Sequence, residues 1–491
     1  MMRGMTPPTR RVLALAPMPP EKSAYALARY SRSPDSIEES LRWVHGHSSE
    51  KFWEQFYFDY GHASIADLGH VIICFEGISE LAAIHIEDET LWDGQAKSSR
   101  YQDFGSGGMV VPDGIHGTPV ETTYRGIAAR LQQAYTTLHA PIKDFLTRTT
   151  PKPDDMKPVV YDRTMNARAF DVTRYLLPLA APTNVGQVTS VRTLEKQICR
   201  LLSLPVAELR AVGEDLKRAC ATPPLNIWGD LTGQAAGLNE PLAPTLARYA
   251  RPNEYVMNTY PELKQVAAER LKLGAIEESE PVELIDPHAP LIELCATLLY
   301  RVTAHPYRQI LAAVRDWTEK EQQELVEVGL RRRGPYDELL KEFHCGYGFI
   351  FDILMDLGGW RDMHRHRRCQ QVRQEFTPIH GYETPALLKD AGVARPYQET
   401  MDLVREQVES LALSHPEAAT YLIPFGCRTR CLFKMDYAEA EYIARLRSGV
   451  KGHFSYRRIA WLMQQAVLAR HPFLGSRIAA TPPDIEDSLT R

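Results

Sequence analysis

Residues 360–373 read Trp360-Arg361-Asp362-Met363-His364-Arg365-His366-Arg367-Arg368-Cys369-Gln370-Gln371-Val372-Arg373. This basic segment begins shortly after an apolar run, residues 349–355, so its charges are expected to lie against a core rather than on a free tail. Guanidinium groups are planar, bind phosphate or carboxylate oxygens in pairs, and remain charged when partly buried. Three interpretations are open at this point: a phosphate-binding site, a solvated helix face, or a patch that contacts nucleic acid.

The composition is that of a globular protein with more than one domain. At 491 residues the chain is too long for a single core, and 44% hydrophobic with 24% charged residues is ordinary for a folded protein. The net charge is −5, so the chain as a whole has no positive field that would gather nucleic acid. A nucleic-acid partner is therefore not expected, and the basic segment must act locally.

Cysteine usage and the N-terminus indicate a cytoplasmic protein. The eight cysteines include no Cys-x-x-Cys pair, which predicts neither a disulfide framework nor a metal site. Residues 1–8 lack the apolar core of a signal peptide, and the apolar stretch 12–16 is too short to span a membrane. We expect reduced thiols and no membrane contact.

Capping residues and periodicity predict a helix-rich chain. Ser33, followed by Pro34 and acidic residues, predicts the cap of an N-terminal helix, and residues 318–321 form a capping box. Residues 122–145 have the spacing of an amphipathic helix. The apolar stretch 71–75 fits either a buried strand or the start of a buried helix.

The order of features repeats along the chain. Both halves contain a Leu-rich approach to a proline, at residues 173–178 and 420–424, which predicts two divergent tandem copies of a unit of about 240 residues. The expected fold class is α+β (mixed α/β), with a small central sheet in each helix-rich copy. The predicted boundaries are an N-terminal copy at 10–225, a linker region at 226–283, a C-terminal copy at 284–476 and a polar tail at 477–491.

At these motifs the chain resembles the flavin-dependent thymidylate synthases, whose signature is Arg-His-Arg, seven residues, then Ser-x-Arg-Tyr. The second half contains Arg365-His366-Arg367, and the first half contains Gly61-His62-Ala63-Ser64, Gly77-Ile78-Ser79 and Ser98-Ser99-Arg100-Tyr101 in the matching register. The resemblance implies a mixed α/β fold of the kind that assembles into homotetramers of chains half this length.

Each half has lost the motif that the other keeps. The first half has Asp88-Glu89-Thr90 in place of Arg-His-Arg, and the second has Glu375-Phe376-Thr377-Pro378 in place of Ser-x-Arg-Tyr. In the family each nucleotide site is shared between subunits. The motif kept by the first half belongs to one side of such a shared site, and the motif kept by the second half belongs to the other side. We therefore expect a single composite site where the two copies meet.

The resemblance implies specific residues for this site. On the substrate nucleotide we expect Ser98, Ser99, Arg100 and Arg174 from the first copy with Arg365 and Arg447 from the second. On the cofactor we expect Arg365, His366, Arg367, His62, Ser64 and Arg192. The alternatives are turn and cap chemistry for His62 and Ser64, and a surface charge for Arg192.

One position argues against the family's own substrate. Three residues before Arg365, where the family places a polar side chain on the nucleotide, this chain has Asp362, and a carboxylate beside a phosphate is unfavourable.

The implied chemistry is transfer of a methylene from methylenetetrahydrofolate to C5 of dUMP or a related pyrimidine nucleotide, with FAD reduced by NADPH. No side chain is assigned as catalytic. The implied assembly is a chain dimer that imitates the family tetramer. The alternative is a flavin- or nucleotide-binding relative without this catalysis, with a regulatory or partner role.

Overall fold

The computed structural model describes residues 18–31, 36–54, 63–105, 108–225, 240–285, 290–334, 340–343, 348–435, 437–476 and 478–489. The chain forms two compact units, each made of segments distant in sequence. Unit 1 comprises Met1–Val71, Thr189–Ile198 and Glu214–Ala250, and unit 2 comprises Ile72–Val188, Cys199–Gly213 and Arg251–Arg491. Within the described residues, no helix is both long and apolar enough to cross a membrane.

Unit 1 is helical. Its elements are α1 (Pro20–Tyr30), α2 (Ile37–His45), α3 (Glu50–Phe52), η2 (Ala63–Leu68) and α10 (Pro244–Tyr249), with parts of α7 (Val191–Ser203) and α8 (Ala207–Ala221). The cap predicted at Ser33 falls outside the described residues, and α2 is capped by Ser36. The Ser36 side chain accepts a hydrogen bond from the backbone N–H of Glu39, and the Glu39 side chain accepts one from the Ser36 N–H. This reciprocal pair satisfies two orphan donors, so Ser36 defines the helix start.

Unit 2 contains most of one three-stranded sheet and all of a four-stranded sheet, and three neighbouring strands of the second repeat the strand order of the first. The first consists of β1 (His70–Ser79), β3 (Pro182–Ser190) and β2 (Asp93–Ala96), in that order. The second has the order β4-β5-β7-β6, with β4 (Val282–Ile285), β5 (Phe349–Asp356), β7 (Arg428–Met435) and β6 (Gln370–Arg373) antiparallel throughout. The stretch 71–75, which the sequence left open, is therefore strand.

The helices that follow the strands are also equivalent. β1 leads into α4 (Glu80–Glu87), capped by Ser79, and β5 leads into α15 (Leu357–Met363), capped by Asp356. β3 and β7 lead in the same way into α7 and α19 (Tyr437–Arg447). Matching strand order, helix order and caps confirm two tandem copies of one α+β fold.

The two copies pair through their equivalent Leu-rich segments. Pro178 and Pro424 form an isolated antiparallel bridge. The backbone N–H of Leu179 donates to the Ile423 carbonyl at 3.0 Å, and that of Phe425 donates to the Leu177 carbonyl at 2.9 Å. Because each bond has a counterpart with the copies exchanged, a local pseudo-twofold axis passes between the two prolines.

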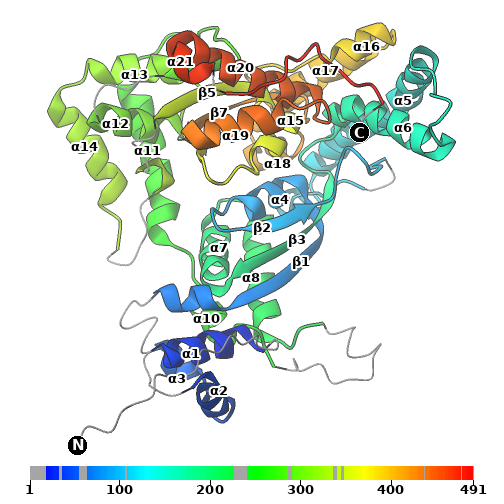
Figure 1. The fold of residues 1–491 in the computed structure, drawn as a ribbon. Coiled ribbons are helices and arrows are strands. Elements are labelled where there is room, and N and C mark those ends of the chain that lie inside the picture. The colour runs from blue at the N-terminus through cyan, green and yellow to red at the C-terminus, as the bar shows by residue number, and fades with distance from the viewer. Residues whose placement is uncertain are drawn as a thin grey trace, which may run out of the picture. The chain divides into compact units, whose positions relative to one another are not determined.

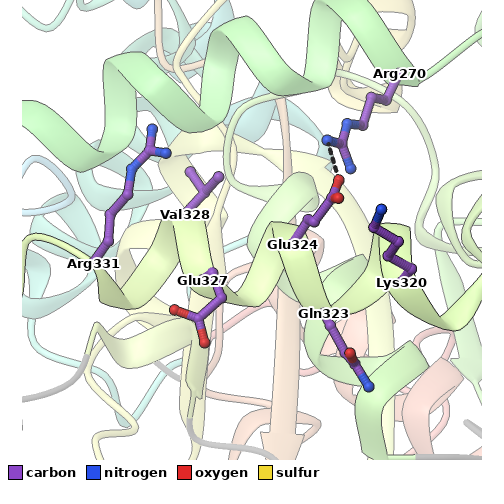
Figure 2. Close-up of a pocket in the computed structure, with 7 residues that line it drawn as sticks. All are labelled: Arg270, Lys320, Gln323, Glu324, Glu327, Val328 and Arg331. Carbon is purple, nitrogen blue, oxygen red and sulfur yellow. Dashed lines mark hydrogen bonds and ion pairs between the residues drawn. The ribbon is translucent and has the colours of Figure 1, made fainter.

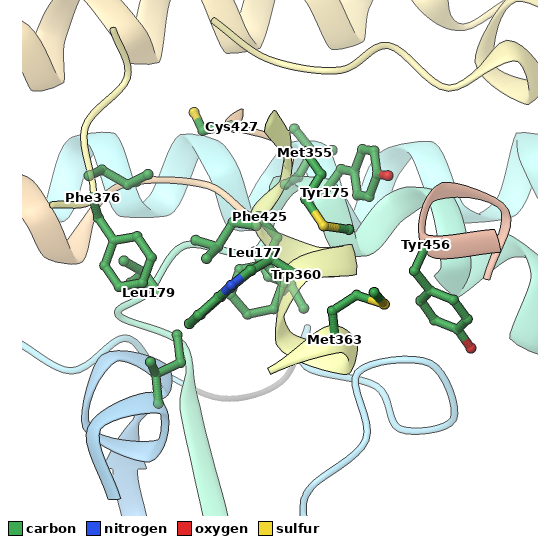
Figure 3. Packing of buried hydrophobic residues seen from close by; sticks show 14 of the residues in the cluster. Tyr175, Leu177, Leu179, Met355, Trp360, Met363, Phe376, Phe425, Cys427 and Tyr456 are labelled. Carbon is green, nitrogen blue, oxygen red and sulfur yellow. The ribbon is translucent and has the colours of Figure 1, made fainter. Parts of the chain in front are cut away.

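Buried side chains of both copies form one core around this axis. Leu177 and Leu179 from the first copy lie beside Phe425 and Trp360 from the second (Figure 3). Long helices of both copies complete the same cluster: α5 (Pro119–Thr149), α6 (Pro158–Thr173), α17 (Ala394–Ala412) and α20 (Phe454–Arg470). The basic segment 360–373 thus starts inside this shared core, as the apolar run before it predicted.

The second sheet has a helical cover. Helices α11 (Glu254–Arg270), α12 (Pro290–Tyr300), α13 (Tyr307–Arg315) and α14 (Glu319–Leu330) gather beside β5 and β7 in Figure 1 and pack on Ile350, Val372 and Leu432. On the first sheet Ile72 is 71% exposed. The predicted linker residues 226–283 include α10, α11 and the first two residues of β4, and the predicted domain boundaries stay a prediction.

The remaining elements are short connectors. They are η3 (Asp113–Ile115), η4 (Arg174–Leu176), η5 (Lys341–Phe343), α16 (Ala386–Asp390), α18 (Pro416–Tyr421) and α21 (Pro472–Gly475). The capping box at Thr318 is confirmed, and the helix predicted at 122–145 lies inside α5.

Candidate functional site

Four arginines from both copies surround one buried carboxylate, that of Asp362 at the end of α15. Arg100 lies in the turn after β2, and Arg174 begins η4, both in the first copy. In the second copy Arg365 follows α15, and Arg447 ends α19. The structure therefore brings together four residues that the sequence predicted on the nucleotide, although Arg100 and Arg447 are more than half of the chain apart.

Asp362 is paired directly with one arginine of each copy. Its Oδ1 forms an ion pair with Arg365 Nη2, and its Oδ2 lies 3.7 Å from Arg174 Nη2. The Asp362 side chain is only 12% exposed. Although burial raises its pKa, Arg174, Arg365, Arg100 and Arg447 together hold the pKa below the ordinary aspartate value. Asp362 is thus an anion at neutral pH.

Arg100 is held in a fixed orientation. Its Nε and Nη2 donate to the two carboxylate oxygens of Asp171, at 2.6 and 3.2 Å, and its Nη1 lies 3.4 Å from the Tyr456 hydroxyl. The side chains of Arg100 and Asp171 are 11% and 3% exposed. A bidentate buried pair fixes the plane of the guanidinium group, so one edge of Arg100 is directed by the first copy and its other edge faces the second.

Arg447 is positioned by the histidine of the Arg-His-Arg motif. Its Nε donates to His366 Nε2 at 2.6 Å, and His366 Nδ1 lies 3.5 Å from Glu439 Oε1. Burial lowers the His366 pKa, with the Arg447 charge adding to the effect against Glu439, so the ring is neutral. The Arg447 guanidinium also lies 5.5 Å from the Tyr456 ring centroid.

Arg174 and Arg365 differ in exposure. Arg174 is 2% exposed and donates to the Gly358 carbonyl at 3.2 Å, while its Nε is buried without a hydrogen-bond partner among the described residues. The Arg365 side chain is 40% exposed. The cluster therefore has a buried end at Arg174 and a partly exposed end at Arg365.

Arg367 faces the first copy. Its guanidinium carbon lies 4.3 Å from the Trp92 ring centroid, and its Nε and Nη2 are buried without a hydrogen-bond partner among the described residues. Burial lowers the pKa of Arg367, with Glu87 and Asp93 opposing the shift. Buried donors without acceptors are unfavourable, so these two N–H groups are available for a ligand oxygen.

The position related to the cluster by the pseudo-twofold axis is occupied by acidic side chains of the protein. Arg200, in the last turn of α7, donates through Nε to Glu89 at 2.8 Å, and Glu89 is the residue that corresponds to His366 of the other copy. Asp88 lies 3.1 Å from Lys341 Nζ and 3.3 Å from His364 Nε2. Although burial raises the Asp88 pKa, Lys341 and His364 bring it well below its ordinary value. The acidic motif of the first copy is thus neutralised internally.

The other predicted residues have separate places. Ser98 and buried Ser99 lie in the turn before Arg100, and the Ser98 hydroxyl accepts from the Arg100 N–H at 3.3 Å. Arg192 belongs to unit 1, where its Nη1 lies 2.9 Å from Asp67. His62 lies outside the described residues, and Ser64 is described only as part of η2. For all of these a ligand role stays a prediction.

Sequence reasoning missed two members of the cluster, Asp171 and Tyr456. Asp171 lies three residues before Arg174, a spacing that puts both on one helical face and could have been noticed. Tyr456 is 356 residues from its partner Arg100, and no local signal relates the two.

A surface hollow elsewhere carries no such chemistry. It lies between α11 and α14 and is lined by Arg270, Lys320, Gln323, Glu324, Glu327, Val328 and Arg331 (Figure 2). Its lining includes surface ion pairs, such as that between Arg270 and Glu324 at 3.0 Å. Solvated ion pairs of this kind are ordinary surface features, so we place the candidate site at the arginine cluster.

Relatives named UPF0159 proteins match most of the chain. A protein of Chlamydia muridarum named UPF0159 protein is 27% identical over 438 residues, covering 86% of this chain and 79% of its own length. A Chlamydia pneumoniae protein of the same name is 26% identical, covering 86% and 78%. A Thermoplasma acidophilum UPF0159 protein is 23% identical, covering 92% and 93%.

The family model described as thymidylate synthase complementing protein matches residues 13–221 and 298–473. The two matched segments coincide with the two copies, and together they include the four arginines and Asp362. The chain therefore belongs to the thymidylate synthase complementing protein family, the flavin-dependent thymidylate synthases.

Proposed function

We propose that this protein methylates C5 of a pyrimidine nucleoside monophosphate, dUMP or a close relative, at one composite site. The observation that carries the proposal is the convergence of Arg100, Arg174, Arg365 and Arg447 from both copies. Four guanidinium groups face two carboxylates, those of Asp171 and Asp362, which leaves two uncompensated positive charges. A phosphate monoester with two negative charges would neutralise them.

In the overall reaction the methylene of methylenetetrahydrofolate becomes the C5 methyl group, and tetrahydrofolate is released. NADPH provides two electrons as hydride, and the C5 hydrogen leaves as a proton. Bound FAD, once reduced by NADPH, would supply the redox chemistry that links these steps. The protein's own contribution is to bind, orient and neutralise, because the difficult bond changes belong to the cofactor.

The residues around Arg367 fit a flavin cofactor. The two buried N–H groups of Arg367 would donate to a phosphate oxygen of FAD, and His366 would keep Arg447 on the nucleotide side of the motif. His366 can do this because its neutral ring accepts from Arg447 at Nε2. Adjacent residues of one motif would thus serve the cofactor and the substrate.

The cysteine beside the motif does not offer an alternative nucleophile. Cys369 is 4% exposed, and burial strongly raises the pKa of its thiol. Because the thiolate is the reactive form, Cys369 would stay a protonated, packed side chain at neutral pH. This supports a mechanism in which no enzyme thiol attacks the pyrimidine ring.

The test is the visible spectrum of the purified full-length protein, before and after NADPH, followed by an assay for dTMP from dUMP and methylenetetrahydrofolate. We expect an oxidised flavin spectrum that NADPH bleaches, and dTMP formation. Arg365→Ala should abolish turnover. Arg395→Ala should not, because Arg395 is an 88% exposed residue of α17. A colourless protein that forms no dTMP and does not rescue a thymidine auxotroph contradicts the proposal.

Asp362 favours a second candidate function, a nucleotide- or flavin-binding relative without this catalysis and with a regulatory or partner role. Its carboxylate already lies on two of the arginines, where it competes with an anionic ligand. This candidate predicts nucleotide binding by calorimetry without turnover. Measured dTMP formation would exclude it.

We also propose that two chains associate. One chain supplies two copies of a fold whose relatives, by the family resemblance, assemble from four, so a twofold-symmetric chain dimer would complete the same arrangement.

A further inference from the structure

Asp362 is the feature of the site that the proposed reaction does not use. The inference drawn from it rests on the proposed function, since it concerns which phosphorylated form of the nucleotide the same site accepts. The carboxylate is buried, it contacts Arg365 and Arg174, and it lies in the field of Arg100 and Arg447. Any anion that binds these arginines must bind close to Asp362.

The charges around the cluster can be assigned. Asp171 is committed to Arg100 through two hydrogen bonds, so Asp362 is the carboxylate shared among the other arginines. The neighbouring arginines Arg361 and Arg368 each lie against a carboxyl group outside the cluster, those of Glu80 and Glu439. His366 is neutral because it is buried. Asp362 therefore sets how much positive charge the cluster offers to a ligand.

We propose that Asp362 makes the site selective for a nucleoside monophosphate over the di- and triphosphate. Coulomb repulsion between Asp362 and the ligand grows with the ligand's charge. The carboxylate therefore weakens the binding of every anion, and it weakens highly charged anions most. With two uncompensated positive charges the site neutralises a dianionic monoester, whereas each further phosphate brings charge that no arginine of the cluster balances.

Asp362→Asn isolates this role, because it removes the charge and keeps the shape. Calorimetry on the full-length protein would compare dUMP, dUDP and dUTP. We expect the dUDP-to-dUMP affinity ratio to rise about tenfold in the variant, the size of one additional ligand charge interacting with the removed charge at roughly 10 Å in an effective dielectric of about 20. The dUTP-to-dUMP ratio should rise further, because dUTP carries a second additional charge. Asp362→Glu, which keeps the charge, should retain the wild-type ratio.

Two further variants serve as controls for the effect of charge. Asp390→Asn makes the same substitution at an exposed residue of α16 and should leave the ratio unchanged. Arg365→Gln removes a positive charge from the partly exposed end of the cluster and should move the ratio in the opposite direction. This opposite sign provides a readout even if Asp362→Asn does not fold, because a purely structural role would not follow ligand charge.

Inorganic phosphate and pyrophosphate serve as probes without a base. If nucleotides bind and the ratio is unchanged in Asp362→Asn, the selectivity role is wrong while the proposed function survives. If wild type binds no nucleotide, yet Asp362→Asn gains more affinity for pyrophosphate than for phosphate, the charge role of Asp362 stands and the proposed function falls. If no anion binds any of these proteins, both are wrong.

Discussion

At the scale of single residues, the site depends on side chains that orient the arginines as much as on the arginines themselves. Arg100 is directed toward Tyr456 and the second copy because Asp171 holds its opposite edge in a bidentate pair. Breaking a buried pair leaves an uncompensated charge, which is far more destabilising than losing a surface pair. Asp171 is therefore a positioning residue whose loss should affect both stability and binding.

Asp171→Asn should lower the free energy of unfolding by about 3 kcal/mol. It should also weaken dUMP binding about tenfold, because a charge-assisted hydrogen bond that fixes Arg100 is lost. Urea unfolding and calorimetry measure the two effects. Asp162→Asn, on the same helix α6, is the control: Asp162 is 68% exposed in its pair with Lys143, so the expected cost is below about 1 kcal/mol. Equal effects of the two variants would contradict a special role for Asp171.

At the scale of elements, α15 places both Asp362 and Arg365. Its start is fixed by Asp356, whose carboxylate accepts from the Gly359 N–H at 2.6 Å and from the Ser455 hydroxyl. Gly359 leaves room for this arrangement, because a Cβ there would lie 2.6 Å from Ser455 Oγ and 3.0 Å from Met355 Cε. The register of α15 against α20 thus requires a residue without a side chain.

Gly359→Ala should lower the free energy of unfolding by about 1–3 kcal/mol, since the new methyl group overpacks the α15–α20 contact. Gly126→Ala in α5 should do the reverse and stabilise by about 0.5–1 kcal/mol, because no heavy atom lies within 4 Å of the added Cβ and alanine favours helix. Thermal and urea unfolding of the two variants provide the comparison. A stabilised Gly359→Ala protein would show that this contact is not close.

At the scale of the whole molecule, the pseudo-twofold pairing of the copies creates two equivalent positions that have diverged. One contains the four arginines around Asp362. At the other, Asp88 and Glu89 are bound to Lys341, His364 and Arg200. Because carboxylates already neutralise the second position, it has no reason to bind another anion.

Native mass spectrometry with excess dUMP should therefore show a chain dimer with two bound nucleotides, one per chain. Four nucleotides per dimer would mean that the position at Asp88 and Glu89 still binds substrate. A monomer with one nucleotide would support the single composite site and contradict self-association. Arg447→Ala should remove the bound nucleotide without changing the oligomer if the dimer forms away from the cluster.

The sequence by itself determined the duplication, the α+β class and the four arginines of the cluster, because local motifs and the repeated order of features indicate them. It also indicated the division of one site between two copies, since Ser98 to Tyr101 survive in one half and Arg365 to Arg367 in the other. Local capping was predictable at Thr318, and the reciprocal pair that caps α2 forms at Ser36.

Only the tertiary structure decided what neutralises these charges. Arg100 contacts Tyr456, Arg174 contacts Asp362 and Glu89 contacts Arg200, and the partners in each pair are distant in sequence. Which residues pair is determined by the packing of the two copies around Pro178 and Pro424. The energy of each charge depends on its burial and on its nearest partners, and a sequence motif specifies neither. From the sequence alone, a carboxylate at Asp362 is unfavourable beside a phosphate. In the folded chain, Asp362 is the counter-ion of the arginines around it.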